Sequence, residues 1–310
     1  MSIKAVGRHY FDPQVCPVTA VRVAAPAAHR GGDAAVDPPG SHPFDLTEVE
    51  HDHDFNELVI VTAGRATHHL KGYAYPVALG DVFLLQSEDR HYFSDRDGLE
   101  LLNVMYDPDL LDLPVEELRQ IPGFNALFLL EPMYRRRHRF ASRLHLPPAE
   151  LQTTVRLAVV ILDEVQRQPP GYAIAAKTKL FELMIALSRQ YDRTQTTEGQ
   201  SLLRLGSVIG ELEKSYDQPW TVEAMADAAH LSPSHLVRVF RKATGQTPLN
   251  YLIQLRLRQA VRLLEDTDLN ITQIAHQVGF ADSNYFARQF RKTMATTPTQ
   301  YRKAHRYGTR

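Results

Sequence analysis

One segment near the end of this chain occurs twice, fifty positions apart. Residues 238–251 read RVFRKATGQTPLNY and residues 288–301 read RQFRKTMATTPTQY, and seven of the fourteen positions are identical. A repeat of this period indicates one helical unit built twice. Before each copy lies a short apolar stripe at i, i+3, i+4, i+7 spacing, which is typical of an amphipathic helix. The sequence therefore predicts two helix-turn-helix units in tandem.

Capping residues place the helices in both units. Ser, Thr, Asn and Asp side chains accept hydrogen bonds from the unpaired N–H groups of a first helical turn, and Pro is favoured at the first helical position. The sequence offers four such caps, one before each of the expected helices: Thr221, Ser232, Asn270 and Asp282. We place the turns between the helices at His230-Leu231 and Gly279-Phe280.

Charge is distributed unevenly along the chain. Residues 201–310 hold 15 Lys and Arg against 9 Asp and Glu, whereas the whole chain is close to neutral at −1. Residues 232–262 and 283–310 hold six and seven basic residues and no acidic one. Acid-free basic stretches on and after the second helix of each unit favour contact with nucleic acid phosphates.

Residues from about 205 to 305 resemble the DNA-binding domain of the AraC/XylS transcription regulators. The resemblance rests on SPSHLVRVFRKATGQTP, on a linker helix at Asn250–Glu265, and on ITQIAHQVGFADSNYFARQFRKTMATTP. It implies two helix-turn-helix units joined by a central helix that bind double-stranded DNA. It also implies a homodimer that works with RNA polymerase, and an activator more than a repressor.

Helix geometry and the family pattern together select the side chains that would meet DNA. Positions two, five and six past each cap point away from the apolar face, and Ser283, one past its cap, lies at the groove-facing tip of its helix. The resemblance implies base contacts at matching positions. We expect base contacts from Ser234, Val237, Arg238, Ser283, Asn284 and Arg288, since Arg pairs with guanine and Asn with adenine. We expect phosphate contacts, which position the protein, from Arg241, Lys242, Arg291 and Lys292.

The first half of the chain has a different pattern. Short strand-like runs between residues 57 and 106 are separated by Gly64, Gly72, Gly80 and Gly98, which favours an antiparallel sandwich or barrel. A single cysteine, Cys16, and the lack of a signal peptide or a membrane-length apolar run favour a cytoplasmic protein that contacts no membrane. We expect no cofactor.

The expected fold class is α+β with two domains. Residues 1–191 would form a cupin-like β-barrel with a helical dimerisation element, and residues 202–310 an all-α tandem helix-turn-helix domain. The polar segment 192–201 would be the linker between them. Residues 24–43, rich in Ala, Gly and Pro, are expected to form a loop or flexible insertion.

A cluster of ionisable residues falls within the expected barrel. His51, His53 and Glu57 stand in an HxHxxxE pattern, and His91 follows Gly80 by eleven residues. The spacing resembles the two cupin motifs, in which these residues would bind a divalent metal. Three interpretations stay open: a metal site, a polar effector pocket, and packing alone. We favour the pocket. Of the adjacent His68 and His69, only one can face inward.

Residues 44–112 resemble the sugar-sensing domain of the L-rhamnose-responsive members of the AraC/XylS family, in HDHDFNELVIVTAGRATHHLKGYAYPVALGDVFLLQSEDRHYF and LLNVMYDPDLL. The resemblance implies a small sugar effector such as rhamnose. Two helices then follow, at 149–168 and 173–191. The first carries Leu151, Val155, Ala158, Leu162 and Val165 at coiled-coil spacing. This seam either dimerises the protein or covers the barrel.

These observations favour a ligand-responsive transcription regulator, not an enzyme, that controls carbohydrate-utilisation genes. Two rivals remain at this point. One is a metal-dependent cupin enzyme that carries a DNA-binding tail, and the other is a constitutive architectural DNA-binding protein with an inactive sensor domain.

Overall fold

A computed structural model describes residues 3–24, 45, 47–87, 89–135, 144–193 and 196–306. Its contacts divide the chain into two units, Met1–Leu203 and Arg204–Arg310. The expected loop at 24–43 lies outside the described residues, apart from Ala24. Within the described ranges, no helix combines the length and the apolar character needed to span a membrane.

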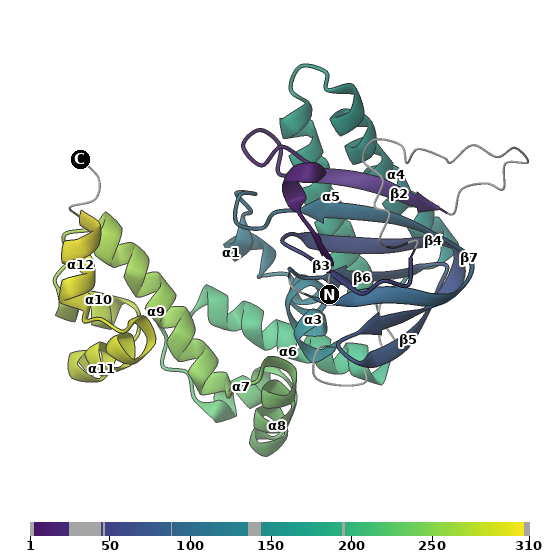
Figure 1. The fold of residues 1–310 in the computed structure, drawn as a ribbon. Coiled ribbons are helices and arrows are strands. Elements are labelled where there is room, and N and C mark those ends of the chain that lie inside the picture. The colour runs from purple at the N-terminus through teal and green to yellow at the C-terminus, as the bar shows by residue number, and fades with distance from the viewer. Residues whose placement is uncertain are drawn as a thin grey trace, which may run out of the picture. The chain divides into compact units, whose positions relative to one another are not determined.

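The first unit is built on one eight-stranded sheet (Figure 1). Its main path runs β1 (Ile3–Ala5), β3 (His51–His53), β7 (His91–Tyr106), β4 (Asn56–Leu70), β6 (Asp81–Leu85) and β8 (Leu144–His145). Two further strands lie outside this path: β2 (Val18–Ala24) pairs with β7, and β5 (Tyr73–Ala78) pairs with β4. All five residues of β6 are buried, as is the run Glu57–Val61 of β4, so these strands are covered on both faces.

Two of the glycines that were expected to separate strands lie inside long strands instead. Gly64 belongs to β4 and Gly98 to β7, and the register between these strands shifts between Val61 and Thr67. Gly64 has φ +66°, and a Cβ there would lie 2.1 Å from the carbonyl oxygen of Gly98. The glycines therefore permit a bulge and a close backbone approach within a continuous strand pair.

Helices follow the sheet. A 3-10 turn η1 (Gly7–His9) lies near the N-terminus, and short helices α1 (Val115–Leu118), α2 (Pro122–Phe124) and α3 (Glu131–Arg135) enclose a π-helical segment η3 (Asn125–Leu130). The expected pair of long helices forms as α4 (Pro148–Arg167) and α5 (Tyr172–Tyr191). Helix α4 packs on α5 and β2, with Thr154, Ala158 and Ile161 buried. The other four residues of the predicted seam are only half-buried.

Helix α6 (Thr197–Lys214) begins inside the segment expected to be a linker, so residues 197–201 are helical. The hydroxyl oxygen of Thr196 accepts a hydrogen bond from the Gly199 N–H, and an apolar stripe that includes Leu205 and Val208 is buried along the helix. The polar composition of residues 192–201 led to the prediction of a linker, although Thr side chains also cap the first turn of a helix.

The second unit contains the two predicted helix-turn-helix pairs. The first is α7 (Val222–Ala228) with α8 (Pro233–Thr244), and the second is α10 (Ile271–Gln277) with α11 (Ser283–Met294). The central helix α9 (Pro248–Asp266) runs between the pairs, and α12 (Pro298–Arg306) closes the unit (Figure 1). Arg256 of α9 donates hydrogen bonds to the carbonyls of Tyr216 and Gln218, both at 2.7 Å, and so ties α9 to the chain that follows α6.

The two turns are made in the same way. His230, at φ +52°, and Gly279, at φ +88°, take the left-handed conformation. The N–H of the next residue, Leu231 or Phe280, then reaches back five residues to a carbonyl oxygen at 2.9 Å. A Cβ at position 279 would lie 2.6 Å from the Asp217 carbonyl oxygen, so the second turn requires glycine for space as well as conformation.

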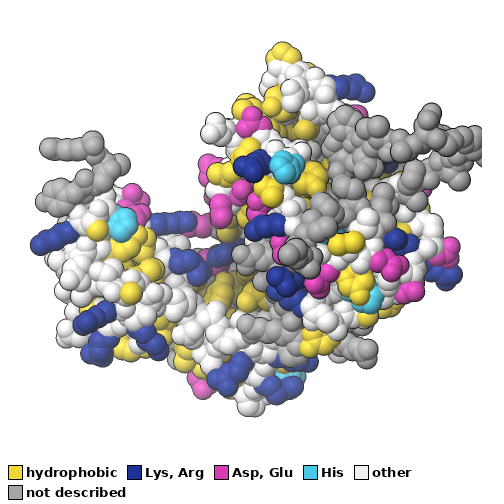
Figure 2. All heavy atoms as spheres, viewed as in Figure 1, with side chains coloured by type: hydrophobic (Ala, Val, Ile, Leu, Met, Phe, Trp, Pro, Cys, Tyr) yellow, Lys and Arg dark blue, Asp and Glu magenta, His cyan; other side chains and the backbone are white. Residues whose placement is uncertain are grey.

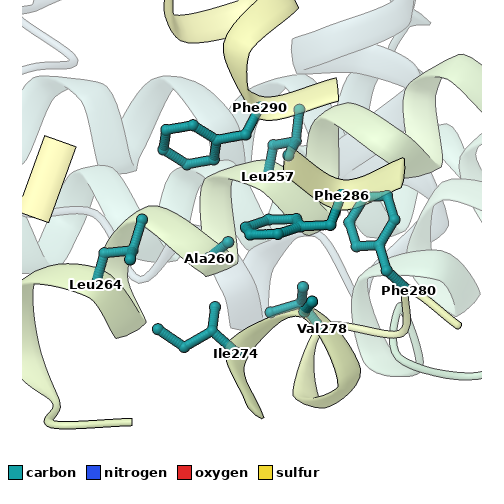
Figure 3. Packing of buried hydrophobic residues seen from close by; sticks show 9 residues of the cluster. Leu257, Ala260, Leu264, Ile274, Val278, Phe280, Phe286 and Phe290 are labelled. Carbon is teal, nitrogen blue, oxygen red and sulfur yellow. The ribbon is translucent and has the colours of Figure 1, made fainter. Parts of the chain in front are cut away.

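The core of the second pair joins α9, α10 and α11 (Figure 3). Phe286 and Phe290 project from α11 with no exposed surface, and their ring centroids lie 5.7 Å apart. Phe280 contacts Phe286 at 5.3 Å between ring centroids. Leu257, Ala260 and Leu264 supply the face of α9. This packing fixes which side of α11 is left for contact with other molecules.

Candidate nucleic-acid interface and buried polar cluster

All four predicted caps are formed. Thr221, Ser232 and Asn270 each accept a hydrogen bond from the backbone N–H three residues on, and Asp282 accepts from the N–H groups of both Asn284 and Tyr285. Asn270 also forms a full capping box with Gln273. The caps set where α8 and α11 begin, and therefore which residues of these helices face outward.

The predicted base-contacting side chains lie on the outward faces of α8 and α11. Their chemistry is polar or basic at five of six positions. Four of these side chains are exposed: Ser234, Arg238, Asn284 and Arg288. The other two, Val237 and Ser283, are half-buried. The Arg288 guanidinium lies 5.7 Å from the centroid of the Tyr285 ring on the same helix. This stacking restricts an otherwise mobile side chain.

The predicted phosphate-contacting residues lie in the last turns of α8 and α11. Arg241 and Lys242 of α8, and Arg291 and Lys292 of α11, are all exposed. Figure 2 shows Lys and Arg side chains gathered over the C-terminal unit, where α8 and α11 lie. Both helices therefore expose mainly polar side chains near the N-terminal end and basic ones near the C-terminal end.

In the first unit, the sheet brings together all four residues of the predicted cluster. His51 and His53 lie on β3, Glu57 on β4 and His91 at the start of β7, and His51 is the register partner of His91. All four side chains have no exposed surface. The Glu57 Oε2 atom lies 3.6 Å from His53 Nε2 and 3.8 Å from His91 Nε2. The pattern seen in the sequence is therefore one constellation in space.

Two further residues complete the cluster. Asp45 and Asn103 are fully buried, and the Asn103 side-chain nitrogen donates to Asp45 Oδ2 at 2.6 Å and to Glu57 Oε1 at 2.7 Å. One amide thus holds both carboxylates. Asp45 Oδ1 lies 3.5 Å from the Nε2 atom of His51.

Burial dominates the electrostatics of these carboxylates. Removal from water, together with the nearby charge of Asp45, raises the pKa of Glu57 well above its ordinary value. Burial likewise raises the pKa of Asp45 to about 6, against the opposing effects of His51 and Asn103. Burial raises the pKa of Tyr10 to about 12, and the nearby charges of Glu57 and Asp45 raise it in the same direction.

Of the adjacent histidines, only His68 faces inward, as expected. It is 2% exposed and stacks between Phe83 and Phe93, with ring centroids 5.0 and 4.8 Å away. His69 points the other way, where its Nε2 atom lies 2.8 Å from the Ser94 hydroxyl. The His68 ring also lies 5.6 Å from that of His91, so it forms one wall of the cluster.

Comparison with known proteins identifies both domains. A helix-turn-helix domain model matches residues 225–304, and an AraC-like ligand binding domain model matches residues 45–184. The HTH-type transcriptional activator RhaS of Enterobacter sp. (strain 638) is 32% identical over 254 residues, which cover 82% of this chain and 87% of that protein. The activator RhaR of the same strain is 32% identical over 256 residues, covering 82% and 86%.

The chain belongs to the AraC family. It is a DNA-binding transcription regulator with an N-terminal ligand-binding domain. Among solved structures, the DNA-binding domain of AdpA in complex with a target DNA is 32% identical, covers 34% of this chain and 96% of that one, and has a TM-score of 0.33.

Two members of the cluster, Asp45 and Asn103, were not predicted from the sequence. Asn103 interrupts the apolar run LLNVMY, and a lone amide in such a run is a usable signal, because a buried amide needs partners. Asp45 follows a long Pro- and Gly-containing segment and carries no local signal.

A pocket of about 380 Å³ in the first unit was also unforeseen. Arg8, Tyr10, Asp12, Cys16, Gln168 and Tyr172 are among its lining residues. Tyr10 connects it with the cluster: its ring packs edge-on against Phe55 at 5.6 Å, and Phe55 stacks on His53 at 4.7 Å.

Proposed function

We propose that this AraC-family regulator activates carbohydrate-utilisation genes in response to a small sugar such as rhamnose. The observation that carries the proposal is the pairing of two equivalent recognition helices, α8 and α11, with a sensor domain that buries a cluster of polar residues. The relatives named as RhaS and RhaR activators support the direction of regulation. The resemblance of residues 44–112 to the sugar-sensing domain of the L-rhamnose-responsive members supports the class of effector.

DNA reading is divided between the two recognition helices. Arg238 and Arg288 donate to guanine, and Asn284 pairs with adenine, while Ser234, Val237 and Ser283 shape the neighbouring contacts. Arg241, Lys242, Arg291 and Lys292 bind phosphates. Because α9 joins the two helix-turn-helix pairs, α8 and α11 approach one face of the duplex about one helical turn, or roughly 34 Å, apart.

The protein acts as a homodimer in the cytoplasm and engages RNA polymerase at the promoter. Helix α4 supports the dimer, since Leu151, Val155, Leu162 and Val165 are half-buried in the single chain while Thr154, Ala158 and Ile161 hold the helix to its own domain. A stripe of this kind gains burial when a second copy covers it.

The effector acts at the cluster of His51, His53, Glu57 and His91. Imidazole and carboxylate groups offer directional donors and acceptors for hydroxyl groups. A site of this kind rejects analogues that lack a hydroxyl, so the response should distinguish epimers. The cluster serves sensing and not catalysis, and a purified protein that turns over a sugar would favour a cupin enzyme with a DNA-binding tail instead.

A reporter assay tests this assignment. Glu57→Gln and His91→Ala should abolish induction by the effector, whereas binding of the promoter DNA by the same purified variants should match wild type. His69→Ala is the matched control, since this histidine faces away from the cluster. A wild-type response from both cluster variants would refute the effector site.

A further inference from the structure

The pocket in the first unit lies between the N-terminal segment and the end of the α4–α5 hairpin. One wall comes from η1 and the chain after it, through residues 8–13 and Cys16. The other wall comes from the end of α4 and the start of α5, through Val165, Gln168 and Tyr172. The purple N-terminal segment and the teal hairpin lie side by side in Figure 1. The volume of about 380 Å³ falls within the range of small-molecule sites, about 300–1,000 Å³.

The N-terminal wall is fixed to the sheet. The Gly7 N–H donates a hydrogen bond to Asp54 Oδ1 at 2.7 Å, which fastens η1 to the residues between β3 and β4. The rings of Tyr10 and Phe11 pack edge-on against the buried Phe55, with ring centroids 5.6 and 6.0 Å away. This wall therefore keeps its shape without a ligand.

The hairpin wall is fixed by its own backbone. Gln168 takes the left-handed conformation at φ +48°, and its N–H donates to the carbonyl oxygen of Glu164 at 2.9 Å. Two prolines follow, and the N–H of Tyr172 donates to the carbonyl oxygen of Pro169 at 2.9 Å. Walls that are set before a ligand arrives lower the ordering cost of binding.

The charged groups of the lining favour an anionic ligand. Arg8 is exposed and forms no ion pair with any residue that the structure describes. Asp12 is the acidic residue of the lining, and its Oδ1 atom already accepts the N–H groups of Gln14 and Val15 at 2.9 and 3.3 Å. A guanidinium binds a carboxylate through two parallel N–H···O bonds. The pocket therefore offers a cation whose partner must come from outside the protein.

The rest of the lining suits a hydroxylated ring. Tyr10, Phe11 and Tyr172 supply aromatic surface. His9 and Gln168 supply polar groups that donate and accept hydrogen bonds. Apolar surface with a few directional polar groups is the usual composition of a small-molecule site. A sugar ring has the complementary pattern, because its C–H groups face aromatic surface while its hydroxyls lie at the edge.

We propose that this pocket is a second small-molecule site, which binds a sugar acid through its carboxylate to Arg8. The site is separate from the buried cluster of His51, His53, Glu57 and His91, whose side chains have no exposed surface. A bound acid would touch Tyr10 and Phe11, and both rings rest on Phe55, which stacks on His53 at 4.7 Å. A sugar acid in the pocket therefore modulates the response to the neutral sugar. The modulation rests on the proposed function, whereas the binding does not.

Titration calorimetry of the full-length protein tests the binding. D-Galacturonate and D-glucuronate are compared with D-galactose and D-glucose, which carry a hydroxymethyl group where the acids carry a carboxylate. At least one acid should bind with one-to-one stoichiometry and at least about tenfold more tightly than its neutral partner, a difference of about 1.4 kcal/mol. Equal affinity within both pairs, or no binding of either acid, would overturn the proposal.

Variants separate the two parts of the site. Arg8→Gln should remove the preference for the acid over its neutral partner, and Tyr172→Ala should weaken both ligands alike. Arg22→Gln is the matched control, because Arg22 is exposed on β2 and does not line the pocket. Circular dichroism checks that each variant is folded. An Arg8→Gln protein that binds the acid as tightly as wild type would overturn the role of Arg8.

A reporter assay tests the modulation separately. Adding the acid that binds should shift the rhamnose concentration needed for half-maximal induction in wild type and leave it unchanged in Arg8→Gln. An acid that binds through Arg8 without this shift would overturn the modulating role. Binding through Arg8 in a protein whose reporter output ignores every neutral sugar would support the pocket and overturn the proposed function. Intact induction by a neutral sugar without binding of either acid would overturn the pocket alone.

Discussion

Removing the Phe286 side chain should strongly destabilise the second helix-turn-helix pair, whereas removing the Arg288 side chain two positions later should act mainly on DNA binding. Phe286 has no exposed surface and meets Phe280 and Phe290 at 5.3 and 5.7 Å between ring centroids. Phe→Ala changes in such cores cost about 3–5 kcal/mol of unfolding free energy. For a domain of this size, each kcal/mol lowers the melting temperature by about 4–8 °C.

The assay is thermal unfolding of a fragment comprising residues 197–310, which keeps α6 whole. Phe286→Ala should lower its melting temperature by at least about 12 °C. Arg288 is exposed and stacks on Tyr285, so Arg288→Ala should cost about 1 kcal/mol or less. The same variant should lose about 1–3 kcal/mol of binding free energy on a cognate duplex, or roughly 5- to 150-fold in affinity.

A Phe286→Ala fragment that melts within about 4 °C of wild type, less than about 1 kcal/mol of destabilisation, would refute the assignment of this core. An Arg288→Ala fragment that binds the cognate duplex as tightly as wild type would refute its reading role. Both results are independent of the sensor domain.

Three further outcomes are expected. Val155→Glu combined with Leu162→Glu should convert the dimer into folded monomers in sedimentation velocity, and a wild-type protein that is monomeric at tens of micromolar would remove the α4 interface. Asp282→Ala should destabilise the 197–310 fragment by about 1 kcal/mol through loss of the α11 cap, measurable as a lower urea midpoint. Gly64→Ala should destabilise the sensor domain more than Gly98→Ala. Both glycines have positive φ, but of the two only a Cβ at position 64 would meet backbone, at 2.1 Å. Equal melting temperatures for the two variants would contradict the bulge at Gly64.

The C-terminal half was predictable because its signals are local. A cap such as Asp282 and the residue it caps are two or three positions apart, and the apolar stripe that buries Phe286 and Phe290 repeats at helical spacing. The predicted linker helix 250–265 also lies within α9. Outward positions such as Arg238 then follow by elimination.

The sheet was less predictable because its order depends on pairing between distant segments. Gly64 was interpreted as a strand boundary, although it permits a bulge inside β4. The four cluster residues formed a recognisable spacing, but Asn103 joins them through the register of β4 and β7, and Asp45 joins them through its hydrogen bond with Asn103. The segment 197–201 has the polar composition of a linker, and yet it is the first turn of a helix whose apolar residues begin at Leu202.

Binding of the full-length protein to duplex DNA from a promoter that it regulates, measured by fluorescence anisotropy between about 50 and 200 mM salt, tests the central claim most directly. With about six to ten phosphate contacts, the logarithm of the binding constant should fall against the logarithm of salt concentration with a slope of about −5 to −9. Arg241→Ala should reduce the slope by about 1 without changing base preference, whereas Arg238→Ala should relax the preference at one base pair. A slope near zero, or equal affinity for the promoter and a scrambled duplex, would contradict the account.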